Sequence, residues 1–412
     1  MDGMRVYLSD AVSPADRLGG VTLSEDAAEA YVAQAAFRAG PPRFIGVELE
    51  WFVHDVADPA RPVSAQTIAA ALDRAGPPVL DGVLSTEPGA QQELSTRPAD
   101  SLDECLDRGR ADMATLRAAF AGSGLRLAGF GLDPYRSPRR HLSLPRYEAM
   151  QEYFDRTGDA GRTMMCSTAS VQISVDAGTA DTLARRWQLS HALAPVLVAA
   201  FANSPLREGR PTGWRCTRQE IWSRIDRTRT APPSVDGDPR AAWAAYALDA
   251  YVLCVRDSGP RWLTPDRLTF RDWIRGEGPR RPTLEDLTYH LTTLFPPVRP
   301  KGFVELRYID AQPDDGWVVP VAVVAALFGD DKAGDAALDA CAPTGDLRQA
   351  LLRAARDGLS DPSLARAARE VFDAAAAALA RLGASPQAQA TVADFTERYV
   401  DRGRSPADDL LN

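Results

Sequence analysis

The sequence predicts an α+β fold. Strand-like segments with alternating apolar and polar residues, such as 44–53 and 303–309, are mixed with helical segments, and no regular strand–helix–strand period is present. Hydrophobic residues make up 45% and charged residues 25% of the 412 residues, which is the composition of a globular protein and excludes a disordered chain. A chain of this length buries one large core or two closely packed ones. Together these features favour α+β over a doubly wound parallel sheet.

In the first part of the chain, capping residues, alternation and chain breakers predict each element. Ser24 is suited to cap a helix that carries Ala, Val and Phe on one face, and Pro88-Gly89 breaks a hairpin. The expected elements are a helix at 24–38, a strand at 44–53, a proline-bearing loop at 55–65, a short helix at 66–74, a hairpin at 83–95, a helix at 102–123, a strand at 125–132 and a polar loop at 134–145.

The second part is predicted in the same way. Thr283 caps a helix with Asp286 three residues on, and Pro195 is expected to kink another helix. The expected elements are a strand at 167–175, a helix at 181–202, a loop at 231–239, a helix at 283–294, a strand at 303–309, alanine-rich helices from 331 to about 380, and a tail at 404–409. We expect residues 1–330 to form the core and residues 331–412 a helical C-terminal segment packed on it.

Charge and composition limit the classes of partner. The chain has 47 basic and 56 acidic residues, a net charge of −9, and no basic cluster, so we expect no nucleic-acid partner. The longest apolar runs, 192–202 and 317–328, carry proline and are too short to span a bilayer, so we expect no membrane partner. Lys301 and Lys332 are the only lysines, so a phosphate site here must depend on arginines, backbone amides and metal ions.

Cysteine usage and leader pattern predict a cytoplasmic protein of unknown oligomeric state, a monomer or a small homo-oligomer. The five cysteines are odd in number and never in CxxC spacing, which indicates reduced thiols. No charged-then-apolar leader with a cleavage site is present. A P-loop, a complete dinucleotide fingerprint, a GxSxG elbow and an HExxH motif are all absent from the sequence. The four histidines are far apart, so each one alone is best explained as a surface or core residue.

The residues with chemical potential are acids on strands. Glu48 and Glu50 lie two apart, so an extended chain places both on one face, with Val47, Leu49 and Trp51 on the other. An ordinary half-solvated strand would show the same spacing. Unusually apolar neighbours instead favour buried carboxylates, which need partners.

Further acids follow on other strand-like segments. Glu87 and Glu93 bracket a Pro-Gly turn, which by itself also suits a solvated turn. Glu305 and Arg307 again lie two apart, and Gln172 occupies a strand of alternating polarity. Oxygen-rich clusters of this kind bind hard cations such as Mg²⁺ beside substrate phosphates, and arginines complete the phosphate site by two-point contacts.

Several motifs in a fixed order give the chain a resemblance to a known family. The chain resembles the plant-type glutamate–cysteine ligases, in particular the bacterial branch that serves ergothioneine biosynthesis, from about Phe44 to Ile309 and again at 404–409. The motifs are Gly46-Val-Glu-Leu-Glu50, Thr86-Glu-Pro-Gly-Ala-Gln-Gln-Glu-Leu-Ser95, Arg146-Tyr-Glu-Ala-Met150, Met164-Met165 with Thr168-Ala-Ser-Val-Gln-Ile173, Phe201-Ala-Asn-Ser-Pro205, Arg218-Gln-Glu-Ile-Trp222 with Asp226 and Arg229, and 290–299 leading into Glu305 and Arg307.

The resemblance implies a fold, a reaction and a set of roles. The fold is a glutamine-synthetase-like antiparallel sheet, cupped around the active site and backed by helices. The substrates are L-glutamate, L-cysteine and ATP, and the product is γ-glutamylcysteine, formed through γ-glutamyl phosphate with Mg²⁺ or Mn²⁺. The implied metal ligands are Glu48, Glu50, Glu87, Glu93, Glu305 and, with less direct correspondence, Gln172. The implied catalytic residues are Arg299 and Arg307, and the implied substrate-binding residues are Arg218, Arg229, Trp222 and Tyr147.

Some alternatives stay open at this level. The four arginines would hold phosphates or glutamate carboxylates, and the sequence does not divide these duties. Trp222 and Tyr147 are equally well explained as core aromatics. A carboxylate–amine ligase of the same fold with other substrates has the same motifs, because specificity depends on residues outside them. A non-catalytic binding protein with this fold is the alternative from another class, and the intact set of acids argues against it.

Overall fold

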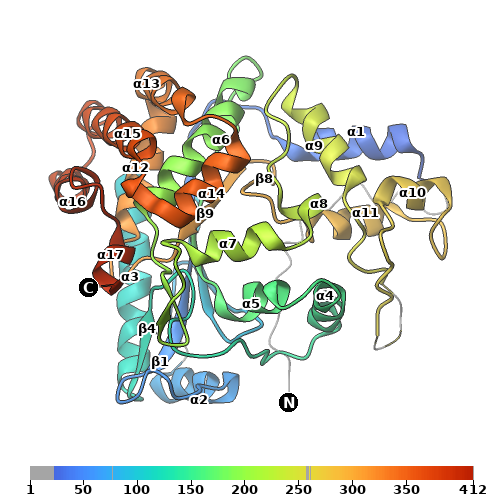
Figure 1. Cartoon of the computed structure of the whole chain (residues 1–412), viewed down its shortest axis with the longest axis horizontal. Helices are drawn as coiled ribbons and strands as arrows, with labels where there is room; N and C mark the ends of the chain where they lie inside the picture. Colours follow the sequence, from blue (N-terminus) through green and yellow to red (C-terminus); the bar gives the residue numbers. More distant parts are fainter. Residues whose placement is uncertain (1–22, 77, 257–258, 260, 412) are drawn as a thin grey trace.

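The computed structural model describes residues 23–76, 78–256, 259 and 261–411. Its centre is a seven-stranded antiparallel sheet with the order β2–β3–β1–β5–β9–β8, in which β4 also pairs with β1 (Figure 1). The strands of this sheet are β1 (Ile45–Asp55), β2 (Val83–Thr86), β3 (Gln92–Ser95), β4 (Leu125–Ala128), β5 (Ser170–Val175), β8 (Val298–Pro300) and β9 (Val304–Asp310). Strands β6 (Leu206–Arg207) and β7 (Arg210–Pro211) form a separate pair.

Helices surround the sheet, so the predicted α+β class is confirmed (Figure 1). The helices are α1 (Glu25–Ala36), α2 (Ala65–Ala75), α3 (Leu102–Ala121), α4 (Pro145–Asp155), α5 (Ala160–Ser167), α6 (Leu183–Ala200), α7 (Thr217–Arg224), α8 (Arg227–Thr230), α9 (Pro239–Asp249), α10 (Phe270–Arg275), α11 (Leu284–Leu291), α12 (Val318–Gly329), α13 (Asp331–Cys341), α14 (Leu347–Asp357), α15 (Pro362–Arg381), α16 (Pro386–Phe395) and α17 (Pro406–Leu411).

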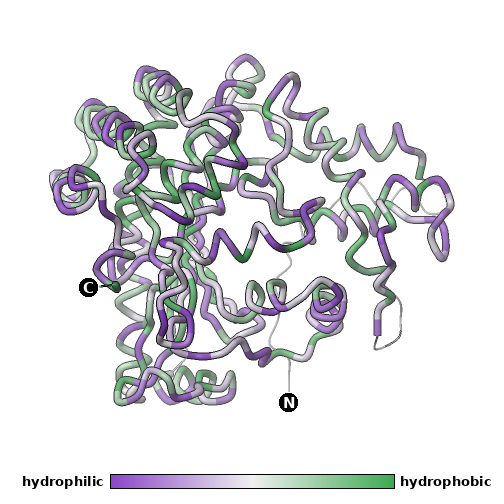
Figure 2. Tube along the Cα trace, viewed as in Figure 1, coloured by the Kyte–Doolittle hydropathy of each residue, from purple (hydrophilic) through white to green (hydrophobic). Residues whose placement is uncertain are grey.

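One face of the sheet is packed against helices. Along β1 the apolar side chains of Val47, Leu49 and Trp51 are buried in the main core, whereas Glu48 and Glu50 alternate with them on the other face. Helices α3, α6 and α12 contact β1, β9 and β5 from the apolar side. Figure 2 shows hydrophobic residues concentrated between the sheet and these helices and hydrophilic residues on the outer turns. The sheet therefore leaves its polar face for a different use.

Most expected elements are confirmed within one or two residues of their predicted ends. Ser24 accepts a hydrogen bond from the Ala27 amide, and Thr283 with Asp286 forms the expected capping box. The strand predicted at 125–132 is shorter, and helices continue beyond the predicted end near residue 380. Residues 1–22 lie outside the described residues. The predicted core includes them, and the expectation of no leader also concerns them.

The segment after residue 331 contacts the rest of the chain at several places. Helices α13 and α14 contact α6, and α15 contacts both α6 and α12. The division into a core at 1–330 and a packed segment at 331–412 stays a prediction. At the far end of the segment, the Ala407 amide donates to the carbonyl of Ala202 (2.8 Å), and Asp408 pairs with Arg215 (3.0 Å).

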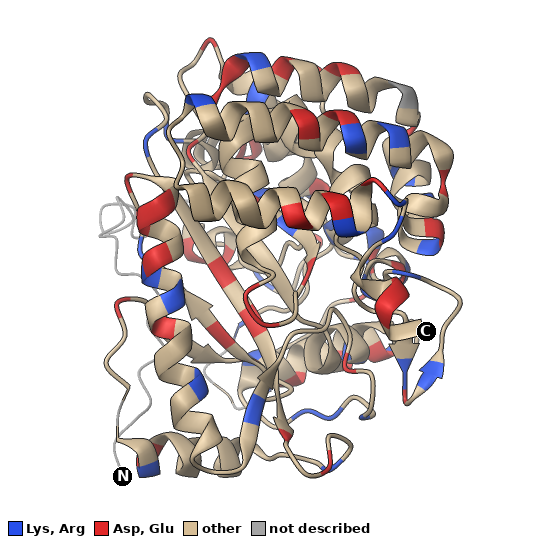
Figure 3. Cartoon of the chain, turned by 90° about the vertical axis from the view of Figure 1, so that its left-hand side faces the viewer, with Lys and Arg blue, Asp and Glu red and all other residues tan. Residues whose placement is uncertain are grey.

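Surface and cysteine features agree with an ordinary globular chain. All five cysteines lie in the described part and are buried and free. On the face drawn in Figure 3, acidic and basic residues are interspersed along the helices. None of the helices in the described ranges is long and apolar enough to cross a membrane.

Candidate active site

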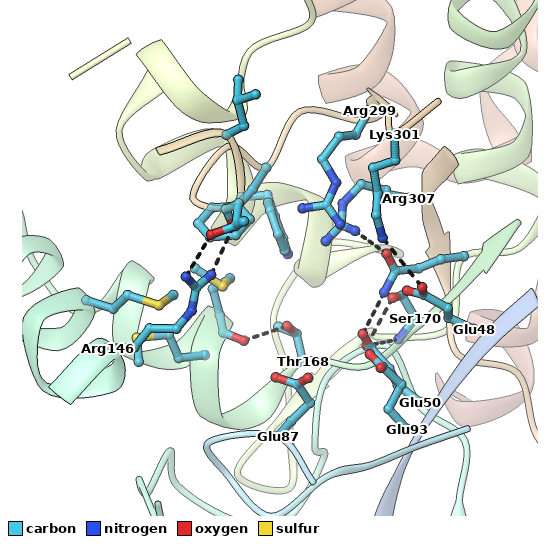
Figure 4. Close-up of a pocket in the computed structure, with 18 of the residues that line it drawn as sticks. Glu48, Glu50, Glu87, Glu93, Arg146, Thr168, Ser170, Arg299, Lys301 and Arg307 are labelled. Carbon is cyan, nitrogen blue, oxygen red and sulfur yellow. Dashed lines mark hydrogen bonds and ion pairs between the residues drawn. The ribbon is translucent and has the colours of Figure 1, made fainter. Parts of the chain in front are cut away.

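A cavity of about 730 Å³ lies against the polar face of the sheet. Its wall receives side chains from β1, β3, β5, β8 and β9 and from helices α1, α4, α5, α7, α9 and α11. Figure 4 shows Glu50, Glu87 and Glu93 on one part of this wall, Glu48 beside Lys301 and Arg307, and Arg146 on the opposite side. The predicted site residues that line the cavity are Glu48, Glu50, Glu87, Glu93, Tyr147, Gln172, Arg218, Trp222, Arg299 and Arg307.

The strand register brings the acids together. Glu50 lies opposite Glu93 in the β1–β3 ladder, and Glu48 lies opposite Gln172 in the β1–β5 ladder. Because paired residues point to the same face of a sheet, all four side chains face the cavity. Glu87 joins them from the turn between β2 and β3. Glu48 and Glu50 are thus partly exposed residues of a strand whose polar face lines the cavity.

Glu50 is held by β5. Its Oε2 accepts hydrogen bonds from the Ser170 amide (2.7 Å) and the Ser170 hydroxyl (3.0 Å), and its Oε1 accepts one from the Gln172 amide group (2.8 Å). These three donors fix the carboxylate and are neutral, so they do not cancel its charge. The protein fixes an anion here and leaves most of the charge facing the cavity.

Crowding of the carboxylates changes their acidity. Burial, and then the charge of Glu50, raises the pKa of Glu87 to about 7. Burial, and then the charge of Glu87, raises the pKa of Glu93 well above its usual value. Burial also raises the pKa of Glu50, although Arg218 and Arg307 partly oppose this. The cavity therefore contains more negative charge than its neighbours compensate.

The raised pKa of Glu87 predicts a pH dependence of stability. Between its ordinary value of 4.5 and about 7, the folded chain holds a proton on Glu87 that the unfolded chain has released. The free energy of unfolding should therefore fall as pH rises through this window. We expect Glu87→Gln to flatten that part of the profile, measured by urea denaturation of the metal-free protein from pH 4.5 to 7.5. Parallel profiles for variant and wild type would contradict the assignment.

Three cations of the cavity wall contact the buried carboxylate of Glu305. Glu305 on β9 has no exposed surface, and its Oε2 accepts hydrogen bonds from Arg299 Nε and Arg307 Nη1, both at 2.8 Å. Its Oε1 pairs with the ammonium of Lys301 at 3.1 Å. Arg307 also donates to Gln172, and Arg218 on α7 donates to the carbonyl of Arg307 (2.7 Å).

These contacts change the role predicted for Glu305. Burial alone would raise the pKa of Glu305, but Arg299, Arg307 and Lys301 together lower it well below its usual range. Both carboxylate oxygens are already engaged by cations, and the side chain is not among the described residues that line the cavity. This geometry does not support Glu305 as a metal ligand. It makes Glu305 the counter-ion that orients the basic wall.

The aromatic candidates and Arg229 differ in position. Tyr147 and Trp222 line the cavity, and Trp222 lies under the guanidinium of Arg218, 5.5 Å from the ring centre. Arg229 is fully buried, donates to Asp226 (2.9 Å) and to the carbonyls of residues 251 and 293, and is not among the lining residues of the described chain. Its predicted contact with substrate is not supported, because its donors already bind the protein.

Two lining cations were not assigned from the sequence. Arg146 is fixed by the Tyr289 hydroxyl and by Thr292, with contacts of 2.9–3.0 Å. It begins one of the family motifs, so that motif was the available signal. Lys301 lies at the turn between β8 and β9. The chain has two lysines, and this scarcity was the available signal for Lys301.

The carboxylates that line the cavity are donors of the kind that a divalent cation uses. Glu48, Glu50, Glu87 and Glu93 offer the carboxylate oxygens that Mg²⁺ prefers. Burial first, and the neighbouring carboxylates second, raise the pKa values of Glu87 and Glu93, and a bound cation would oppose both effects. As they stand, the side chains of the described ranges form no group of three or more His, Cys, Asp or Glu arranged to hold a metal ion. The chemistry of the donors fits a metal, whereas their spacing is not that of a formed site.

Comparison with known proteins identifies the family. The model of glutamate–cysteine ligase family 2 (GCS2) matches residues 44–412. The chain is 40% identical over 399 residues to the glutamate–cysteine ligase EgtA of Mycobacterium tuberculosis, covering 95% of this chain and 90% of the relative. It is 39% identical to EgtA of Mycolicibacterium smegmatis (94% and 91% covered) and 32% identical to a chloroplastic glutamate–cysteine ligase of Oryza sativa (60% and 52% covered).

A solved structure agrees at the level of the fold. The glutamate–cysteine ligase of Francisella tularensis, crystallised with AMP, has a TM-score of 0.54 and 14% identity, covering 91% of this chain and 85% of that chain. At that identity the likeness concerns the fold alone. The match over residues 44–412 and the identity across nearly the whole chain decide the family. This chain belongs to glutamate–cysteine ligase family 2.

Proposed function

We propose that the chain joins the γ-carboxylate of L-glutamate to the amine of L-cysteine with consumption of ATP, giving γ-glutamylcysteine, ADP and phosphate. The observation that carries this proposal is the cavity, in which a carboxylate group and a cationic group face each other, in a chain 40% identical to EgtA. The ergothioneine branch and a cytoplasmic location stay part of the proposal.

The chemistry explains why the cavity needs both charges. A carboxylate is a poor electrophile, so ATP phosphorylates the γ-carboxylate, and the cysteine amine then displaces phosphate from the acyl phosphate. Glutamate and ATP are both anions and must be brought together first. Arg218, Arg299 and Arg307 would bind phosphates and carboxylates, because a guanidinium holds either in a two-point contact. Tyr147 and Trp222 would pack on the apolar parts of the substrates.

The carboxylates would serve the nucleotide through a metal ion. Glu48, Glu50, Glu87 and Glu93 would hold Mg²⁺ or Mn²⁺, which when bound neutralises phosphate charge in phosphoryl transfer. Gln172 hydrogen-bonds both Glu50 and Arg307, so it would keep the acidic and basic groups in register. The protein's own contribution is orientation: β1, β3 and β5 fix the carboxylates, and Glu305 fixes the arginines.

A phosphate-release assay with product identification tests the function. We expect phosphate and γ-glutamylcysteine in equal amounts with glutamate, cysteine, ATP and Mg²⁺, and loss of product when any one is omitted. EDTA should abolish turnover, and Mg²⁺ or Mn²⁺ should restore it. Full turnover in excess EDTA would refute the metal, and a clear preference for another amine or acid in a substrate panel would make the chain a related carboxylate–amine ligase.

Arg307→Lys tests the two-point contact. Arg307 reaches Glu305 and Gln172 at once, and lysine keeps the charge but not the planar fork. We expect kcat/KM to fall at least about 10-fold, or about 1.4 kcal/mol of transition-state stabilisation, with an unchanged thermal midpoint. Arg366→Lys, on an exposed face of α15, is the matched control. Near-normal turnover in Arg307→Lys would assign the two-point contact with phosphate or carboxylate to Arg218 and Arg299.

A further inference from the structure

We infer that the ammonium of Lys301 moves away from Glu48 and binds the phosphates of the nucleotide. This inference rests on the proposed function and assigns a residue that the sequence motifs do not include. Lys301 lines the cavity at the turn between β8 and β9, and Figure 4 shows it beside Arg299 and Arg307.

Charge balance leaves Lys301 available. Three cations, Arg299, Lys301 and Arg307, contact the single carboxylate of Glu305. If Lys301 moves, Glu305 keeps both arginines at 2.8 Å on its Oε2 and loses the lysine from its Oε1. The second partner of Lys301, Glu48, is 3.8 Å away, too long for a hydrogen bond. Movement of the ammonium therefore breaks one hydrogen bond, to Glu305 Oε1, which the contact with a phosphate has to replace.

Exposure separates Lys301 from its two neighbours. Its side chain is 41% exposed, whereas those of Arg299 and Arg307 are 13% exposed. The arginines are set into the wall, and Lys301 stands at the rim on a flexible four-carbon stem with three N–H donors. A ligand that extends from the wall to the rim would contact all three cations.

The surroundings of Lys301 suit the nucleoside end of the same ligand. The wall of the cavity beyond Lys301 is formed by Tyr31, Ala35 and Ala36 of α1. The amide of Gly302 donates to the carbonyl of Ala36 (2.9 Å), so this part of α1 lies directly beside the turn that carries Lys301. An apolar wall next to a cation is the arrangement that a purine nucleotide needs, with the base on the wall and the phosphates at the ammonium.

The residue type suits contact with a phosphate group. Arginine occupies 45 of the 47 basic positions in this chain, so a lysine at the cavity rim stands out. A guanidinium matches a carboxylate in a planar two-point contact, whereas an ammonium acts as a compact point charge that binds phosphate from any side. The neighbouring arginines already provide two-point contacts, and Lys301 adds a cation that can follow a phosphate group.

The scarcity of lysine makes a direct test practical. The full-length protein is acylated with N-acetoxysuccinimide, and the modification rates of Lys301 and Lys332 are measured by peptide mass spectrometry. Lys332 is exposed on α13 and serves as the internal reference. With Mg²⁺ and the non-hydrolysable β,γ-imido analogue of ATP, we expect Lys301 to react at least fivefold more slowly. Tripolyphosphate should protect it and adenosine should not, while the rate of Lys332 stays constant.

The same experiment can overturn the inference. An unchanged rate at Lys301 under nucleotide saturation, established by calorimetry on the same preparation, refutes it. Protection by glutamate alone would refute it too, because Lys301 would then bind a carboxylate. A preparation in which nucleotide protects Lys301 but no γ-glutamylcysteine forms supports the phosphate contact and refutes the proposed substrates. Absence of any nucleotide binding refutes both.

Steady-state kinetics give a second readout. We expect Lys301→Met to raise the KM for ATP at least 10-fold with little change in the KM for glutamate, and Lys301→Arg to recover part of the loss. Lys332→Met removes the same charge from an exposed helix and should match wild type. Equal KM values for ATP in Lys301→Met and wild type would refute the inference. Thermal denaturation of each variant checks that the fold is intact, and the acylation of wild type does not depend on any variant.

Discussion

Replacement of Glu50 by glutamine is expected to lower kcat/KM by about 100-fold or more, equivalent to about 2.7 kcal/mol of transition-state stabilisation. Glutamine keeps the shape of the side chain and removes the negative charge that faces the cavity. The fold should survive, because burial raises the pKa of Glu50 and its charge is therefore a cost to the metal-free protein. Glutamine has one acceptor atom where Glu50 has two, so it loses a contact with Ser170 or Gln172 while the cost of the buried charge is removed, and we expect an unfolding midpoint close to that of wild type.

Kinetics and thermal denaturation of the same preparation separate the two effects. Glu397→Gln, at an exposed side chain in the turn of π-helix after α16, is the matched control and should leave both quantities unchanged. Mg²⁺ titration adds a third measurement, since loss of one carboxylate should weaken the affinity for the metal. A Glu50→Gln protein with normal turnover, or one that is inactive because it has unfolded, would contradict the assignment.

Glu305→Gln should lower the free energy of unfolding. The substitution leaves Arg299, Arg307 and Lys301 crowded together without their buried counter-ion. Removing one partner of a buried ion pair costs about 3–5 kcal/mol, so we expect a loss of about 3 kcal/mol in the free energy of unfolding at pH 7 and a large loss of activity. Urea denaturation measures the first quantity, with Glu50→Gln as the internal comparison.

The pH dependence of this loss follows from the lowered pKa of Glu305. A carboxylate with a lowered pKa in the fold contributes stability that is present above its unfolded pKa of about 4.3 and is lost as pH falls toward the folded value. The difference between wild type and Glu305→Gln should therefore be constant near neutrality and shrink below pH 4. A difference that stays constant in acid would show that Glu305 acts through packing and not through its charge.

Local patterns predicted the parts of the fold that local interactions determine. Alternation placed Glu48 and Glu50 on one face, and capping chemistry placed the helix that begins after Thr283. The helices between residues 217 and 275 were not predicted, because α7, α8 and α10 have eight residues or fewer and the 11-residue α9 has weak amphipathic periodicity. Strand β8 has three residues and is defined by its pairing with β9, which no local pattern reveals.

The site was predictable in its residue types and less so in their partners. Strand and turn patterns singled out six of the predicted lining residues, and the family resemblance supplied the other four, Tyr147, Arg218, Trp222 and Arg299. The sequence could not show that Glu305 belongs to the cations rather than to the acids, because that depends on β8 folding beside β9. Arg229 was predicted to bind substrate, but Asp226 and two backbone carbonyls occupy its donors. The two carbonyls come from distant parts of the chain, which the sequence does not place.

The contacts of Ala407 and Asp408 have a consequence for the order of events during protein synthesis. They hold Ala202 and Arg215, the two ends of the segment that leads into Arg218. Ser204, inside that segment, and Cys216, directly after it, donate to the buried Asp310 at the end of β9. A ribosome makes residues 404–411 long after Arg218 has emerged. The contacts that these residues make with Ala202 and Arg215 therefore form only after every residue that lines the cavity has been synthesised.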